Sequence, residues 1–493
     1  MTSNYRQAKR PNMAATLLTM LVAAVMFAGV VVPAQAQTFT SLYSFQGTVS
    51  NYGAYPLGMV QATNGYLYGI TAAGGDNQDE GTVFKISTSG KESIVCSFDD
   101  GGSCGVVQAG PENLTLGTSG SFYAFDNNGR FYKITTSGKL TVLSTTSGSN
   151  VPKAPLIQAS NGNFYGTNYG GIYGNCFGTC GSIFKITPSG KLTTLYSFCA
   201  VVQNNACTDG DEPSFALTQG SDGNLYGTTS SGGNDGVNDG YGTIFKITLT
   251  GTLTTLYNFP GFTPPSSALV EGADGNFYGT TYTGGSGKYS PGGTFFTVTP
   301  SGAVTTLYNF CSLENCADGD QPQNIYLATD GNFYGITSFG GANSLGTIFQ
   351  MTPGGTLTTL HSFDGTDGSA TQCCGTLMQD TNGTLYGTLQ SGGESWPGCS
   401  PVCVGTIFSL DMGLGPFVKT LPTSGKVKAA VKILGTALTG ATSVTFNGTA
   451  ATFKVASSSE ITTTVPEGAT TGVVKVVTAG GTTLTSNTVF QVP

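Results

Sequence analysis

The chain has 493 residues, of which 9% are charged and 74 are glycine, and its formal net charge is −8. An acidic chain with so few charges is a poor candidate for binding nucleic acid or an anionic membrane, because both need basic patches. The length allows several domains, and the composition is typical of a large extracellular β protein and excludes a disordered chain.

The first 36 residues have the pattern of a secretory signal. Arg6, Lys9 and Arg10 form a positive region, Ala14–Val32 is rich in apolar residues, and Ala34-Gln35-Ala36 is a small-residue cleavage site. An uncleaved anchor is the alternative, since this apolar stretch nearly reaches the length of a membrane span. The cleavage site favours removal before Gln37. The mature chain would then have no membrane span and would be secreted or extracytoplasmic. Its 19 − 3 = 16 positive and 27 negative residues give a formal charge of −11.

One sequence motif recurs through most of the chain. Its marker is the Tyr of an (F/L)YG step, which recurs every 42 to 61 residues at Tyr68, Tyr123, Tyr165, Tyr226, Tyr278, Tyr334 and Tyr386. A period near 50 residues is typical of propeller blades and too long for a solenoid rung.

Each unit contains four strand-like runs, which we name strands A to D. In the third unit, strand A is Pro155–Ala159, strand B begins at Phe164, strand C lies in Gly181–Gly190 (GSIFKITPSG) and strand D is Leu192–Phe198 (LTTLYSF). Val, Ile, Thr, Tyr and Phe dominate these runs, and Asn-Gly or Asp-Gly turns join A to B, as in β-hairpins. The second unit is eroded, and its B–C loop has shrunk to a turn.

A single sheet of this kind cannot bury both of its faces, whereas a ring of seven sheets can. The sequence therefore predicts a seven-bladed β-propeller over residues 37–411. The two aromatics of strand B, such as Phe164 and Tyr165, should point to opposite faces and be buried between blades.

Two segments compete to complete the last blade. Residues 38–45 (TFTSLYSF) match strand D but precede every other strand, which favours closure of the ring by the N-terminal strand. Residues 417–421 (FVKTL) are the alternative, as a degenerate local strand D.

The sequence pattern changes from about Phe417 onward, where aromatic residues become rare. Six or seven short Val/Thr strands separated by turns predict an immunoglobulin-like β-sandwich over residues 412–493.

Both regions resemble known families. Asp274–Gly285 (DGNFYGTTYTGG), Gly181–Gly190 and Leu192–Phe198 are similar to the GloVer tandem repeats of secreted bacterial proteins. That resemblance covers roughly residues 38–411 and implies extracytoplasmic repeats of unassigned biochemical role, and it supplies no catalytic residues to carry over. The tail resembles the IPT/TIG domain at Ile433–Gly435, Val444–Gly448, Val465-Pro466, Gly472 and Phe490–Val492. The resemblance implies a spacer or interaction module.

Twelve cysteines follow the signal, and secretion makes disulfides plausible. Five local disulfide bridges are expected, and the pairing of the adjacent Cys373 and Cys374 is left undecided. The expected pairs are Cys96/Cys104, Cys176/Cys180, Cys199/Cys207, Cys311/Cys316 and Cys399/Cys403.

All of these cysteines lie in or beside B–C and D–A loops. In a four-stranded meander these loops share one face of the ring, which we call the loop face. The short A–B and C–D turns share the other, which we call the turn face. Binding function usually lies on variable loops, so the loop face is the candidate binding surface.

Acidic Gly turns on the loop face are weak candidates for calcium, because their oxygens are hard ligands. None has a complete calcium-loop pattern, and solvated turns explain them as well. These candidates are Asp209, Asp211, Asp318, Asp320, Asp364 and Asp367. No other cofactor is expected.

Few residues point to catalysis. His361, the one histidine, occupies the Tyr position of strand D and is expected to be structural. A pair of carboxylates could hydrolyse a glycoside without histidine, but sequence does not show which carboxylates meet. Trp396 is a candidate for stacking on a sugar ring or for capping its own loop.

The sequence leads first to a non-catalytic extracellular module that binds a glycan or a protein. A carbohydrate-active propeller enzyme and a structural matrix component are the alternatives. An enzyme should show two facing carboxylates in a concave pocket. A binding module should show exposed aromatics on the loop face. The sequence does not determine the ligand, surface anchoring or the oligomeric state.

Overall fold

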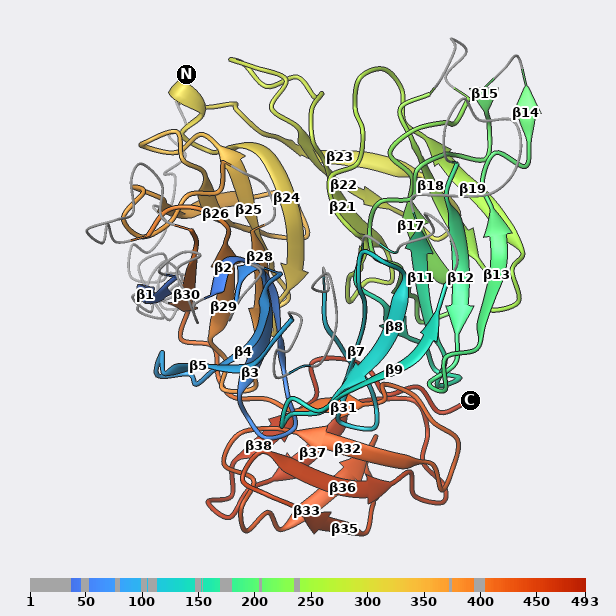
Figure 1. Cartoon of the computed structure of the whole chain (residues 1–493), viewed down its shortest axis with the longest axis vertical. Coiled ribbons are helices and arrows are strands. Elements are labelled where there is room, and N and C mark those ends of the chain that lie inside the picture. The colour runs from blue at the N-terminus through green and yellow to red at the C-terminus, as the bar shows by residue number, and fades with distance from the viewer. Residues whose placement is uncertain are drawn as a thin grey trace, which may run out of the picture. The chain divides into compact units, whose positions relative to one another are not determined.

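The computed structural model describes most of the chain after residue 36 (Figure 1). The described residues are 37–45, 53–75, 80–98, 104, 113–146, 152, 154–168, 180–203, 206–234, 240–371, 375–393 and 404–493. The predicted signal in residues 1–36 lies outside them. Within the part of the chain that is described, no helix has the length and apolarity that a membrane crossing requires.

The repeat region folds into antiparallel four-stranded sheets, and the described residues contain seven of them. The first is β2 (Gly53–Gln61), β3 (Leu67–Gly74), β4 (Thr82–Ile86) and β5 (Glu92–Ser97). The second is β6 (Thr115–Leu116), β7 (Phe122–Phe125), β8 (Arg130–Ile134) and β9 (Leu140–Thr145). The third is β10 (Ile157–Gln158), β11 (Phe164–Asn168), β12 (Ser182–Ile186) and β13 (Leu192–Ser197). The fourth is β16 (Thr218–Gln219), β17 (Leu225–Thr228), β18 (Thr243–Ile247) and β19 (Leu253–Asn258).

The remaining sheets follow the same order of strands A to D. The fifth is β20 (Val270–Glu271), β21 (Phe277–Thr281), β22 (Thr294–Val298) and β23 (Val304–Asn309). The sixth is β24 (Asp320–Leu327), β25 (Phe333–Phe339), β26 (Thr347–Met351) and β27 (Leu357–Ser362). The seventh is β28 (Thr376–Gln379), β29 (Leu385–Leu389), β30 (Thr406–Asp411) and β1 (Thr38–Ser44). A small hairpin of β14 (Val202–Gln203) and β15 (Ala206–Cys207) and a 3₁₀ turn η1 (Glu314–Cys316) lie in D–A loops.

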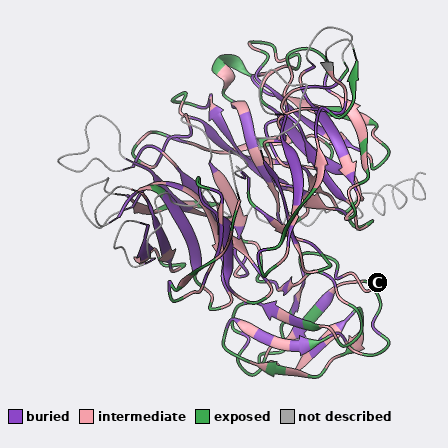
Figure 2. Ribbon diagram, turned by 45° about the vertical axis from the view of Figure 1, so that its right-hand side comes forward, coloured by how far each residue is buried: buried purple, intermediate pink, exposed green. Residues whose placement is uncertain are grey.

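The hydrophobic cores show that the sheets follow one another in a closed ring. Each sheet shares a cluster of buried residues with the next one in sequence. The seventh sheet shares such a cluster with the first, where Phe45, Tyr386 and Ile407 pack with Leu67 and Phe84. Strands B and C, such as β11 and β12, are buried along most of their length, whereas strands D, such as β13, are half-buried or exposed (Figure 2).

The N-terminal strand closes this ring, as the first of the two sequence interpretations predicts. Strand β1 pairs antiparallel with β30, from Thr38 opposite Asp411 to Ser44 opposite Thr406. The alternative strand D at residues 417–421 is wrong, because Lys419–Leu421 forms β31 and pairs with β32 of the C-terminal domain.

The two aromatics of strand B point to opposite sides, as predicted, and join neighbouring sheets. Tyr226 stacks on Phe277 of the next sheet with ring centroids 4.0 Å apart. Tyr278 meets Phe333 of the next sheet in a tilted arrangement, with ring centroids 4.4 Å apart. Such offset or tilted aromatic pairs add stability beyond the area that they bury.

The glycine of the (F/L)YG step provides room for an aromatic ring. A Cβ atom on Gly335 would lie 2.4 Å from Cζ of Phe349 in the adjacent strand C, closer than any real Cβ contact. The same Gly–Phe contact recurs at Gly227 and Phe245. In the eroded second sheet, Ala124 and Tyr132 take these two places.

Residues after Asp411 form the predicted sandwich, although with eight described strands instead of six or seven. One sheet is β31 (Lys419–Leu421), β32 (Ala430–Leu434), β36 (Glu460–Thr464) and β35 (Phe453–Val455). The other is β34 (Thr449–Ala450), β33 (Ser443–Phe446), β37 (Val474–Val477) and β38 (Thr483–Thr485). Both sheets contribute to one core, in which Phe446 meets Phe490 at 5.0 Å.

Candidate functional site: the loop face

Paired threonines fix the bases of the B–C loops. At the end of strand B, Thr337 Oγ1 lies 2.9 Å from Thr347 Oγ1 at the start of strand C, and it also accepts the Thr347 N–H at 3.0 Å. Thr281 and Thr294 repeat both contacts in the fifth sheet. Because these hydroxyls are buried and satisfied, each loop starts and ends on a fixed base.

The D–A loops are held by an aspartate that bonds back to strand D. Tyr196 Oη donates to Asp209 Oδ2 at 2.7 Å, and the N–H groups of Ala200 and Val201 donate to the same carboxylate. Tyr308 and Asp318 repeat this arrangement at 2.8 Å. Burial, together with the neighbouring carboxylate, raises the pKa of both tyrosines.

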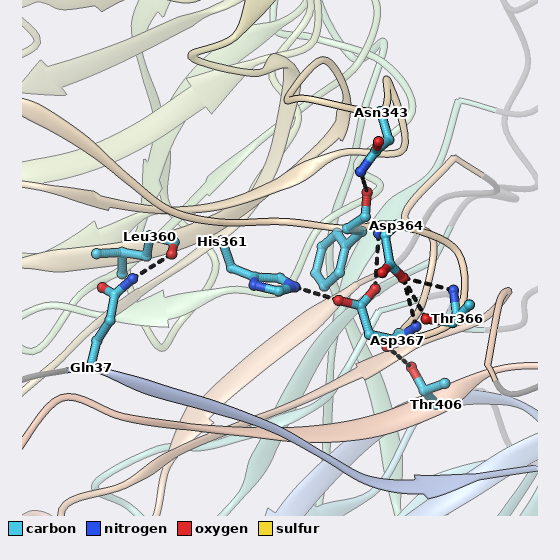
Figure 3. Close-up of polar contacts among 9 residues, drawn as sticks. Gln37, Asn343, Leu360, His361, Asp364, Thr366, Asp367 and Thr406 are labelled. Atoms are coloured by element: carbon cyan, nitrogen blue, oxygen red, sulfur yellow. Dashed lines mark hydrogen bonds and ion pairs between the residues drawn. The ribbon is translucent and has the colours of Figure 1, made fainter.

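His361 takes the place of tyrosine in the sixth sheet (Figure 3). Its Nε2 lies 2.6 Å from Asp367 Oδ2, and Asp367 Oδ1 accepts the Asp364 N–H at 3.0 Å. The imidazole also stacks on Phe39 of β1, with ring centroids 3.8 Å apart. The histidine therefore has the same loop-holding contact as the tyrosines, in agreement with the structural interpretation of its repeat position.

The aspartates named as weak calcium candidates make hydrogen bonds within their own loops. Asp209, Asp318 and Asp367 use their oxygens to accept bonds from strand D and from backbone N–H groups of their own loops. Asp364 Oδ1 accepts the Thr366 N–H and hydroxyl, and these hydrogen bonds lower its pKa.

The other two candidates lie in different settings. Asp211 forms a backbone bridge with Ser231, and burial raises the pKa of Asp320 at the start of β24. Throughout the described ranges, no three His, Cys, Asp or Glu side chains come together in a way that could hold a metal ion.

Disulfides brace the same loops. The structure joins Cys96 to Cys104, Cys199 to Cys207 and Cys311 to Cys316, with Cα atoms 5.1, 4.5 and 4.1 Å apart. Cys180 is also disulfide-bonded. The other expected cysteines, Cys176, Cys399 and Cys403, lie outside the described residues, as do Cys373, Cys374 and Trp396.

Large aromatic side chains are exposed on the loops of the fourth and fifth sheets. Phe262 is 71% exposed, Tyr289 49% and Tyr282 42%. Phe262 also meets Tyr241 of the preceding B–C loop edge to face, with centroids 5.3 Å apart. We call Tyr241, Phe262, Tyr282 and Tyr289 the aromatic loop patch.

The loops that carry this patch support one another. Thr283 Oγ1 donates to Phe262 O at 2.8 Å, and Tyr282 N–H donates to Pro264 O at 2.9 Å. Tyr289 N–H donates to Cys311 O at 3.2 Å, next to a disulfide, and Lys288 Nζ lies 5.0 Å from the centroid of the Tyr289 ring. The exposed rings are therefore displayed from braced loops.

Sequence reasoning identified this face but not these residues. A usable signal exists, since Phe262, Tyr282 and Tyr289 are aromatics outside the repeated strand positions. The catalytic alternative would need two facing carboxylates in a concave pocket. A depression of ≈ 230 Å³, open solvent included, lies between the second and third sheets and is lined by Asn113, Ala124, Phe125, Pro152, Ala154, Pro155 and Leu156. No carboxylate is among these lining residues.

Comparison with known proteins supports both parts of the fold. The model of the Gloeobacter/Verrucomicrobia repeat matches residues 107–290 and 264–432, and the IPT/TIG domain matches 417–492. No curated protein matches the sequence.

Solved structures with a similar chain path include a streptogramin B lyase. It is 15% identical with a TM-score of 0.48, over 76% of this chain and 97% of the lyase. Another is a protein of unknown function from Dyadobacter fermentans. It is 12% identical with a TM-score of 0.42, over 77% of this chain and 100% of the other. Identities this low do not indicate a shared activity.

Proposed function

The chain belongs to the Gloeobacter/Verrucomicrobia repeat family, and we propose that it is a secreted, non-catalytic module that binds a glycan through the aromatic loop patch. The observation that carries the proposal is the exposure of Phe262, Tyr282 and Tyr289 on loops with fixed bases. Aromatic residues exposed on a rigid scaffold are typical of binding surfaces.

The chemistry of the patch favours a sugar polymer. Flat aromatic rings offer apolar faces to the C–H side of a pyranose, and the tyrosine hydroxyls can bond to its hydroxyls. Thr283 and Ser286 lie in the same loop and add small polar groups. The mature chain would carry a formal charge of about −11, so a neutral polysaccharide suits it better than an anionic one.

Three features taken together support secretion as part of this proposal. The N-terminal pattern is that of a signal peptide, the loops contain disulfides, and the chain ends in an IPT/TIG domain. Disulfides of this kind persist in oxidising compartments.

A polysaccharide panel tests the proposal. The mature chain, from Gln37 onward, is incubated with insoluble neutral and acidic glycans, with calcium or with chelator, and retention and released sugar are both measured. We expect retention on a neutral glycan, no release of sugar and no effect of chelator. Released sugar would support the carbohydrate-active enzyme instead. Neither retention nor released sugar on any glycan would favour a protein ligand or a structural role.

A further inference from the structure

The ring has one place where its closure is not covalent. Strand β1 is joined by the chain to the first sheet, and β30 belongs to the seventh, so the β1–β30 ladder is the seam of the ring. Opening the ring requires this ladder to separate, because every other neighbouring pair of sheets is connected by the chain.

Thr381, in the A–B turn of the seventh sheet, connects both sides of this seam to the C-terminal domain. Gln61 Nε2 of the first sheet donates to Thr381 Oγ1 at 2.7 Å, and Thr436 Oγ1 of the C-terminal domain lies 3.0 Å from the same atom. Since Thr381 accepts from Gln61, its own hydroxyl proton is available to Thr436. Phe417 N–H donates to Thr381 O at 3.0 Å. The Thr381 side chain is fully buried.

The C-terminal domain also contacts the first and second sheets directly. Ser459 Oγ donates to Thr63 O at 2.8 Å, in the first A–B turn. A Cβ atom on Gly65 of that turn would lie 3.2 Å from Ser459 Cβ. In the second A–B turn, a Cβ atom on Gly120 would lie 3.1 Å from Lys432 Nζ.

From these contacts we infer that the IPT/TIG domain is a clasp that holds the seam of the ring closed. It follows β30 in the chain and bonds to the seventh sheet through Thr381, while Ser459 holds the first sheet on the other side of the seam. Separation of β1 from β30 would therefore also have to break one of these two contacts. The inference goes beyond the proposed ligand and does not depend on it.

Hydrogen exchange of the full mature chain, followed by mass spectrometry, tests the clasp. The double variant Thr436→Val/Ser459→Ala removes the two side-chain hydrogen bonds, and Thr464→Val/Ser458→Ala is a matched control at exposed positions of the same domain. We expect exchange in residues 38–44 and 406–411 to accelerate by roughly three- to tenfold in the first variant, the range for loss of one hydrogen bond, because opening the seam breaks only one of the two contacts. We expect no change in the control. Unchanged exchange at the seam in the first variant would overturn the inference.

A crosslink keeps the test decisive if the double variant loosens the C-terminal domain itself. Gly65→Cys/Ser459→Cys places two thiols where the Cβ atoms nearly meet. Exchange at the seam should be slower with this disulfide formed than after its reduction, with wild type given the same reductant as the reference. Equal exchange in the two states would count against the clasp.

Discussion

His361 Nε2 lies 2.6 Å from Asp367 Oδ2, and this pair replaces the Tyr–Asp pairs of two other sheets. His361 lies opposite Ile348, as Tyr196 lies opposite Ile183 and Tyr308 opposite Phe295. In the first sheet the loop after strand D is held by a disulfide instead, because Cys96 occupies the equivalent position and is bonded to Cys104. A residue of strand D thus holds the following loop in four sheets by three different chemistries.

Removing the carboxylate from this pair should destabilise the sixth sheet. Asp367→Ala leaves the His361 nitrogen and the Asp364 N–H without their acceptor, and we expect a loss of about 1–3 kcal/mol in the free energy of unfolding. Urea unfolding measures this loss, with Glu467→Ala at an exposed position as the control. His361→Tyr restores the repeat's own residue and should cost less than His361→Ala. Equal losses for the two histidine variants would argue against a shared role.

The glycine beneath the strand C aromatic should not tolerate a methyl group. Gly335→Ala forces Phe349 to move, because the new Cβ would lie 2.4 Å from its ring. We expect destabilisation of about 1–3 kcal/mol, as for other overpacked cores. Gly354→Ala in the C–D turn of the same sheet is the control, since its nearest atom would be 3.8 Å away. Thermal unfolding of the two variants should differ clearly.

The contact between β1 and β5 of the first sheet should be sensitive to pH through Glu92. Burial raises the pKa of Glu92 to about 6, although a hydrogen bond with Tyr43 of β1 acts in the opposite direction. The folded state therefore holds this proton more tightly than the unfolded state. The resulting stabilisation is present below the ordinary pKa and is lost as pH rises through about 6.

Glu92→Gln should consequently raise stability above pH 7 by up to about 1 kcal/mol, a value reduced for partial exposure, and have little effect near pH 4. Unfolding in urea at the two pH values gives the comparison. A variant that is equally stabilised at both would contradict the assignment.

Lys419 should titrate well below ordinary lysines. Burial lowers its pKa to about 8, and the charge of Asp380 only partly opposes this. Its amino group donates to Gln379 O. Stability should therefore increase as pH rises from about 8 toward the ordinary lysine range, because the folded state prefers the neutral amine. Lys419→Met should remove this rise, which unfolding experiments between pH 7 and 10 would detect.

The fold could be predicted from sequence because the same strand-like sequence pattern recurs around each marker tyrosine. The choice of the closing strand could not be settled this way, since residues 38–45 and 417–421 both have strand character. The strand pairing decides between the two segments, because Phe39 lies opposite Leu410 of β30, whereas Lys419 lies opposite Leu434 in the C-terminal domain. Strand A was also overestimated in places, because only Ile157–Gln158 of Pro155–Ala159 pairs as a strand.

The candidate site was predicted only as a face. Exposure of Phe262 and Tyr289 depends on how two loops fold against each other, and no repeat pattern encodes that. The contacts that the calcium candidates make within their loops were missed for a related reason. Asp209 is satisfied by a tyrosine 13 residues earlier in the chain, a contact that is invisible when the Asp-Gly turn is considered alone. Aspartate following a strand D tyrosine in the third and fifth units is the signal that could have revealed it.

Binding of a neutral glycan through the aromatic loop patch is tested most directly by titration into wild type and three variants. The titrant is a soluble oligosaccharide of the neutral glycan that retains the protein in the panel. Phe262→Ser and Tyr289→Ser each remove an exposed ring from the aromatic loop patch, and Tyr66→Ser removes one, 40% exposed, beside an A–B turn on the opposite face. We expect each patch variant to weaken binding by roughly ten- to a hundredfold, as for loss of about 1.4–2.8 kcal/mol at an aromatic contact, with Tyr66→Ser unchanged. Equal affinity of wild type and both patch variants would place the binding surface elsewhere.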